Sequence, residues 1–150
     1  MKSMAAPKSL TARLIDSLHM EAMLLTDEVR AYFDDHGRAE RNALPPMLRL
    51  SFSCESLKVT NRLTQVMAWL AAHRRAAGGS DASAFRAAKP LMAVGSDPHA
   101  LTGLPEAARS LIVASCDLYM RIRWLDERMD RSWAGCKPAR TLPGNLEDVL

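Results

Sequence analysis

Residues 47–77 contain neither glycine nor proline, and this long uninterrupted stretch most constrains what the chain can fold into. Pro45 and Pro46 stand directly before it, and proline is well tolerated in the first turn of a helix. Gly78 and Gly79 follow it and would end the helix. A helix over this stretch would be about 45 Å long at the standard rise per residue. We therefore expect a bundle built around one long helix.

The apolar residues of this helix fall on two sides. One side carries Met47, Leu50, Cys54, Leu57, Ala68 and Ala71. The other side carries Leu48, Phe52, Val59, Leu63, Val66 and Leu70. A helix that is apolar on two sides is usually covered on both. The pattern predicts the central helix of a bundle, with Cys54 buried, or a helix at an oligomer interface, and we predict a homodimer.

A first helix is predicted from a cap at Ser9 or Thr11 to about Phe33. Its apolar stripe, at helical spacing, comprises Leu10, Leu14, Leu18, Ala22, Leu25, Val29 and Tyr32. Polar residues follow the stripe, and Gly37 is expected to end the helix in the left-handed conformation.

A third helix is predicted to begin at Pro105 and Glu106 and to end near Trp133. Its three-four seam comprises Leu111, Ser115, Leu118, Ile122, Leu125 and Met129. Between the second and third helices, residues 78–103 are rich in glycine, serine, alanine and proline. Ser80 or Asp81 could cap a short helix in that connection, and the rest reads as loop.

The predicted fold class is all-α, a three-helix bundle of long antiparallel helices with a short accessory helix or loop between the second and third. We expect a flexible N-terminus at 1–9, a helical domain at 10–133 and a flexible tail at 134–150. Sparse aromatic residues, 5% of the chain, argue against a sheet protein. No apolar run is long enough to span a membrane, and the N-terminus lacks the apolar core of a signal peptide. The expected location is the cytoplasm.

Catalytic and metal-binding patterns are not found in the sequence. No nucleophile elbow, phosphate-binding loop or CxxC pair occurs, and Cys54, Cys116 and Cys136 are widely spaced. The histidines are scattered and are expected to be ordinary surface residues: His19, His36, His73 and His99. We expect no catalytic residues, no metal and no cofactor. The net charge of +3 is mild, so nucleic acid is not the expected partner.

Apolar residues on the outer sides of two helices are the better candidates for a partner or dimer interface. On the third helix, Val113, Met120 and Trp124 lie nearly opposite the main seam, and Arg121 and Arg128 flank them. On the first helix, Met20 and Leu24 lie away from the main stripe. Exposed methionine, tryptophan and arginine are enriched in protein interfaces. The alternative is a wider core, or a cover supplied by the long connection.

A polar strip on the second helix comprises Glu55, Lys58 and Arg62. Polar residues that interrupt an apolar side can fix the register of packed helices. This structural role and a partner-binding role both remain open for the strip.

Several motifs together resemble the alphaproteobacterial family of regulators of CtrA degradation (RcdA-like). They are Tyr32-Phe33, Gly37-Arg38, Leu44-Pro45, the run ESLKVTNRLTQ at 55–65, Trp69-Leu70 and the run LYMRIRWLD at 118–126. The likeness is good from about residue 14 to residue 75 and fair from 104 to 129. The segment 78–103 departs from the family pattern.

The resemblance implies a dimeric three-helix bundle without enzymatic activity. Members of the family act as adaptors that help to deliver CtrA and other cargo to the ClpXP protease together with partner proteins.

Two alternative functions come from the residues themselves. The arginine groups and basic pI would suit a DNA-binding or transcription-related module, and the many methionine and alanine residues would suit a bundle that binds a small ligand in a cavity.

Overall fold

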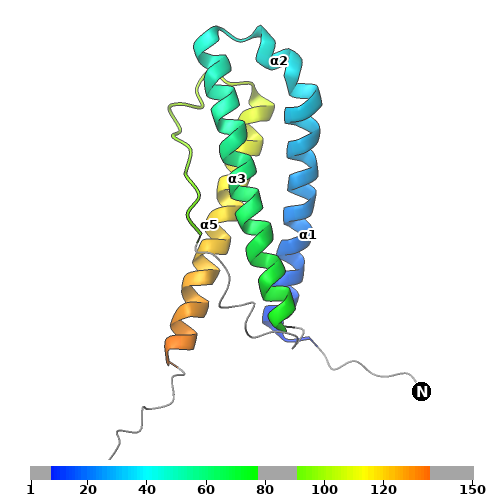
Figure 1. Ribbon diagram of the computed structural model, residues 1–150, viewed down its shortest axis with the longest axis vertical. Coiled ribbons are helices and arrows are strands. Elements are labelled where there is room, and N and C mark those ends of the chain that lie inside the picture. Colours follow the sequence, from blue (N-terminus) through cyan, green and yellow to red (C-terminus); the bar gives the residue numbers. More distant parts are fainter. Residues whose placement is uncertain (1–7, 78–90, 136–150) are drawn as a thin grey trace, which may run out of the picture.

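Three long helices form a bundle in the computed structural model, which describes residues 8–77 and 91–135. They are α1 (Leu10–Ala31), α3 (Pro46–Ala77) and α5 (Glu106–Gly135), shown in Figure 1. The described ranges contain no strand, and the predicted all-α three-helix fold is confirmed. The predicted accessory helix at residues 80–88 lies outside the described residues, as do nearly all of the predicted flexible N-terminus and tail.

Contacts between side chains fix the relative directions of the three helices. Arg62 of α3 meets Ser115 of α5, and further along both helices Trp69 meets Asp126, so α3 and α5 run in the same direction. The expectation of antiparallel helices is therefore wrong for this pair. Helix α1 is antiparallel to both, since Asp16 near its start binds Arg74 near the end of α3. The parallel pair is possible because the segment from residue 91 climbs beside α3 to the end of the bundle where α5 begins (Figure 1).

Helix α1 begins at a serine cap, as predicted. The Ser9 Oγ accepts the backbone N–H of Ala12 at 3.2 Å, which satisfies one of the unpaired donors of the first turn. The predicted apolar stripe is wrong at its start, because Leu10 and Leu14 are exposed and burial begins at Ile15. The reason lies in the length of the partner helix: Ala12 already faces the last turn of α3, so no described residue covers Leu10.

The predicted end of the first helix at Gly37 is also wrong. A π-helical stretch, η1 (Tyr32–His36), continues directly into α2 (Gly37–Ala43), and Gly37 has a right-handed φ of −77°. Glycine is needed there for a close approach. A Cβ at Gly37 would lie 2.9 Å from the Tyr32 carbonyl oxygen and 3.0 Å from its ring. The Tyr32 hydroxyl donates to Glu40 and closes this turn.

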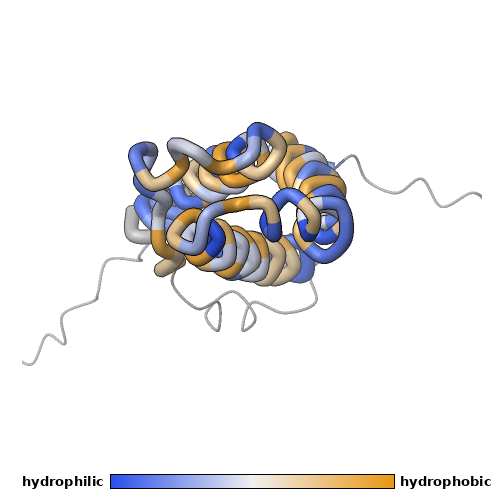
Figure 2. The backbone as a smooth tube through the Cα atoms, turned by 90° about the horizontal axis from the view of Figure 1, so that it is seen from above, coloured by the Kyte–Doolittle hydropathy of each residue, from blue (hydrophilic) through white to orange (hydrophobic). Residues whose placement is uncertain are grey.

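The core lies along the axis between the helices. From α3 it receives the second apolar side predicted from the sequence, namely Phe52, Val59, Leu63, Val66 and Leu70. From α1 and α5 it receives Ile15, Leu18, Ala22, Val29, Ala108, Ile112, Leu118 and Ile122. Each fully buried aliphatic or aromatic side chain contributes about 1.5–3 kcal/mol relative to exposure. Seen from above, hydrophobic and hydrophilic residues alternate along each helix (Figure 2).

The other apolar side of α3 is largely left open by the described residues. Met47 is 75% exposed and Leu57 is 71% exposed, and Leu50 and Cys54 are exposed between them. The expectation that the bundle itself covers both sides, with Cys54 buried, is therefore wrong. Helices α1 and α5 both pack toward the core side, which leaves the opposite side open. We call Met47, Leu50, Cys54 and Leu57 the outer stripe of α3.

Candidate protein-interaction surface

The residues predicted as an interface are all exposed. Trp124 is 52% exposed, and the other predicted residues are also open to solvent: Met20, Leu24, Val113, Met120, Arg121 and Arg128. A wider core is therefore not their role within the described part of the chain. We call these residues the α1–α5 face.

An ion pair connects the two helices of this face. The Arg121 guanidinium binds the Glu21 carboxylate with two nitrogens and also lies 3.6 Å from Asp117. The hydrogen bonds that Arg121 donates to Glu21 raise the pKa of Arg121 above its usual value. Arg121 and Leu24 line the same surface groove of about 240 Å³ between α1 and α5. The structure thus brings together residues from both predicted helices.

Trp124 and Arg128 form a second contact on this face. The Arg128 guanidinium carbon lies 4.2 Å from the centre of the Trp124 ring, which is the geometry of a cation–π interaction. Tryptophan and arginine are the side chains that most often dominate binding energy in interfaces. Their contact places a charged group directly against the exposed indole.

The polar strip behaves differently from the α1–α5 face. Glu55 and Arg62 are 2% and 0% exposed, while Lys58 remains half-buried and binds Glu55 at 2.8 Å. Arg62 Nε donates to the Ser115 hydroxyl at 3.1 Å, and its Nη1 donates to the carbonyl of Val94 at 2.9 Å. In the described structure the strip therefore joins α3, α5 and the connecting segment.

Sequence reasoning missed the residues that complete this network. They are Gln65, Val94, Ser96 and Tyr119, together with Ser115, which the sequence placed in the seam of α5 without a role. A serine in an otherwise apolar seam was the one signal that pointed to a buried polar contact. The partners in residues 92–96 carried no signal, because their contacts are mostly made by backbone atoms.

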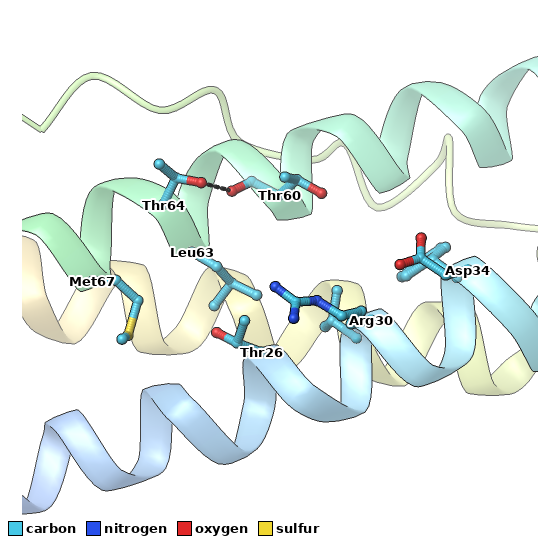
Figure 3. Close-up of a pocket in the computed structure, with 9 residues that line it drawn as sticks. Thr26, Arg30, Asp34, Thr60, Leu63, Thr64 and Met67 are labelled. Carbon is cyan, nitrogen blue, oxygen red and sulfur yellow. Dashed lines mark hydrogen bonds between the residues drawn. The ribbon is translucent and has the colours of Figure 1, made fainter.

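A second groove lies between α1 and α3, on the side away from α5 (Figure 3). It has a volume of about 420 Å³, with Leu63 and Met67 of α3 facing Thr26 of α1. Arg30 reaches toward the middle of it and Asp34 lies at one end (Figure 3). It is an open surface groove with mixed lining, so it lacks the enclosed apolar character typical of small-molecule sites.

Histidines and arginines depart in part from their predicted surroundings. His73 is buried and stacks on Trp69 with ring centres 3.6 Å apart, so the expectation of a surface residue is wrong. Burial lowers the pKa of His73.

Two arginines of the predicted basic groups are paired with carboxylates. Arg74 pairs with Asp16, and Lys8 and Arg74 lower the pKa of the Asp16 carboxyl. Arg74 and Arg121 each bind a carboxylate, Asp16 and Glu21 respectively, which weakens the case for a phosphate-binding surface.

The described ranges contain neither a metal-binding cluster nor a membrane-spanning helix. No group of three or more histidine, cysteine, aspartate or glutamate side chains is placed to hold a metal ion there. None of the helices in residues 8–77 and 91–135 is long and apolar enough to cross a bilayer.

This chain is similar to a described protein family and to a solved structure. The family described as "Protein of unknown function (DUF1465)" matches residues 6–149. The chain is also similar to the crystal structure of RcdA from Caulobacter crescentus CB15, with 32% sequence identity and a TM-score of 0.66. That likeness covers 77% of this chain and 91% of the other. No curated protein matches the sequence.

Proposed function

This chain belongs to the DUF1465 family and to the family of RcdA, the regulator of CtrA degradation, and from that premise we propose that it is a non-enzymatic adaptor. It binds a cell-cycle regulator such as CtrA, together with protease-associated partners, and promotes degradation of the regulator by ClpXP in the cytoplasm. The observation that carries the proposal is the α1–α5 face, which the described residues leave exposed although it is built from interface-type residues.

The α1–α5 face is the surface that binds protease-associated partners. It combines an exposed apolar centre at Met120 and Trp124 with charged groups at Glu21 and Arg121. Transient interfaces have this composition, with aromatic residues, methionine and arginine enriched and a polar rim. The charged rim keeps the face compatible with water when no partner is bound.

The outer stripe of α3 is the seam of a homodimer. Its residues Met47, Leu50, Cys54 and Leu57 carry no charge and follow one line along the helix. In a twofold interface each patch meets a copy of itself, so a patch without charge avoids like-charge repulsion. The two surfaces belong to different helices and can be occupied at the same time.

A reconstituted degradation assay tests the adaptor role. Purified ClpXP, CtrA and the required partner proteins are combined with and without this chain, and loss of CtrA is followed on gels. We expect the chain to raise the degradation rate and Trp124→Glu to reduce that gain about tenfold, because one well-placed interface residue contributes about 1–2 kcal/mol or more.

The matched control introduces the same charge at an exposed position outside both surfaces. Ala39 of α2 is exposed, and Ala39→Glu should leave the rate unchanged. An equal loss in Ala39→Glu and Trp124→Glu would contradict the assignment of the α1–α5 face. A wild-type chain without any effect on degradation would contradict the adaptor role.

A further inference from the structure

Residues 91–97 form an extended segment that helix side chains hold by its backbone. The Met92 N–H donates to Gln65 Oε1 and the Ala93 N–H donates to the Tyr119 hydroxyl, each at 2.9 Å. The Val94 carbonyl accepts Arg62 Nη1 at 2.9 Å. These bonds involve main-chain atoms, so a different extended peptide could make them as well.

The side chains of the segment alternate as in a strand. Leu91 and Ala93 are half-buried against the core, whereas Met92 and Val94 are exposed. Extended peptides present alternate residues to opposite sides. The surface that the segment covers between α3 and α5, here called the α3–α5 groove, therefore accepts two aliphatic side chains, Leu91 and Ala93, and binds the backbone of residues 92–94.

Arg62 is left incompletely satisfied by the segment. It is 0% exposed, and its acceptors are neutral: the Ser115 hydroxyl, the Val94 carbonyl and the Ser96 hydroxyl. Its Nη2 is buried and has no hydrogen-bond partner within the described structure. A buried donor without an acceptor is costly, and a carboxylate is the acceptor that a guanidinium fork fits best.

The charges around the groove also favour an anion. Glu55 is the one buried carboxylate beside Arg62 in the described structure, and it reaches Arg62 only through the Ser96 hydroxyl, which donates to it. Lys58 already pairs with Glu55 at 2.8 Å. One positive charge is thus left over, and the Asp97 carboxylate of the segment accepts the His99 N–H instead.

We propose that the α3–α5 groove is a binding site for an extended acidic peptide of a partner protein, and that residues 91–97 occupy it from within the chain. The proposal rests on the proposed adaptor function only in taking the ligand to be a protein. The segment and the partner peptide compete for the same donors and acceptors. The tethered segment therefore sets the affinity that a partner peptide must exceed in order to displace it.

The test uses the full chain and two labelled peptides. One has the sequence LMAVGSD of residues 91–97, and the other has glutamate in place of its serine. Fluorescence anisotropy measures both on the wild type and on Ser96→Ala, which loosens the segment but keeps Arg62, Gln65 and Tyr119. We expect the acidic peptide to bind Ser96→Ala at least tenfold more tightly than the wild type.

The ratio of the two peptide affinities isolates Arg62, because competition from the segment affects both peptides equally. We expect the acidic peptide to bind at least tenfold more tightly than the serine peptide, and Arg62→Gln to reduce this ratio to near one. Equal affinities of the two peptides on Ser96→Ala, or an unchanged ratio in a folded Arg62→Gln chain, would overturn the proposal.

Hydrogen exchange provides a readout that does not require Arg62→Gln to fold. Saturating acidic peptide should speed exchange of the Met92 and Ala93 amides in the wild type at least tenfold, because it displaces them. Tyr119→Phe should speed exchange at Ala93 without peptide, and the matched Tyr32→Phe should not. Bound peptide with unchanged exchange at these amides would place it elsewhere and refute the competition. None of these measurements depends on ClpXP or CtrA.

Discussion

Arg62 shows how a single residue can join three parts of the chain. Its guanidinium binds α5 through Ser115 and the connecting segment through Val94 and Ser96, while its own helix is α3. A buried charge is tolerated only when hydrogen bonds replace its hydration. Removing one such partner leaves the charge uncompensated, and each lost charged bond costs about 1.5–3 kcal/mol.

Gly37 is the residue whose side chain is excluded by geometry. Gly37→Ala should lower the free energy of unfolding by about 1–2 kcal/mol, because its Cβ would meet the Tyr32 carbonyl oxygen at 2.9 Å, and the overpacking exceeds the gain in helix propensity. Urea unfolding followed by circular dichroism measures the change.

Gly95 provides the matched control for that substitution. A Cβ at Gly95 has no neighbour within 4 Å, so Gly95→Ala should change stability by less than about 0.5 kcal/mol. If both alanine variants lose the same stability, the close approach at Tyr32 is not the reason for glycine at position 37.

At the scale of elements, the contact between α3 and α5 is anchored by aromatic and polar groups together. The Trp69 indole N–H donates to Asp126 at 2.7 Å, and its ring stacks on His73 one turn later. Tryptophan buried between helices usually needs such a partner for its N–H. The stack places a titratable ring inside the contact between the two parallel helices.

The buried ring makes the stability of this contact depend on pH. Burial lowers the pKa of His73 below its ordinary value of 6.5, although Asp126 and Asp130 oppose the shift. As pH falls below about 6.5, the unfolded chain takes up the proton first, so the free energy of unfolding decreases until the folded ring is also protonated. Urea unfolding at pH 7.5, 6.5 and 5.5 should show this decrease.

Two glutamine variants separate His73 from the other titrating groups. His73→Gln should flatten the decrease between pH 7.5 and 5.5, whereas His99→Gln, at an exposed position, should leave it unchanged. An equally steep decrease in His73→Gln would show that other titrating groups cause the pH dependence.

At the scale of the whole molecule, the parallel arrangement of α3 and α5 decides which surfaces stay open. The connecting segment covers part of α3 and ends in a turn at residues 98–104, where Gly103 has a φ of +93°. Only glycine adopts that conformation readily. The outer stripe of α3 and the α1–α5 face remain outside this cover.

The proposed dimer should respond to the outer stripe and not to the α1–α5 face. Leu57→Glu should weaken self-association at least tenfold, because it places two like charges in a twofold apolar seam. Light scattering over a concentration series measures the mass. Trp124→Glu should leave the mass unchanged while it impairs degradation, and the reverse pattern would exchange the two assignments.

Cys54 offers an independent measurement of the same seam. In a chain with Cys116→Ser and Cys136→Ser, the exposed Cys54 should form a disulfide-linked dimer under mild oxidation, whereas Leu57→Glu in that chain should suppress it. A monomer under all these conditions would contradict the dimer.

The sequence by itself determined where the three long helices lie and which side of the third helix is buried. An unbroken stretch at 47–77, a capping serine at position 9 and a three-four seam on the third helix suffice for this, because capping and periodicity are local properties. The same pattern marked Trp124 and Met120 as outside the core, and the structure places them there.

Only the tertiary structure decided which apolar side of α3 is covered, that the chain stays helical through Gly37, and which groups Arg62 binds. Two apolar sides look equivalent in one helix until the positions of α1 and α5 are known. Contacts such as Ser96 with Glu55 join residues distant in sequence, and no local pattern encodes them. Burial of a charge depends on partners that the fold brings together, so the polar strip could be found from the sequence but its contacts could not.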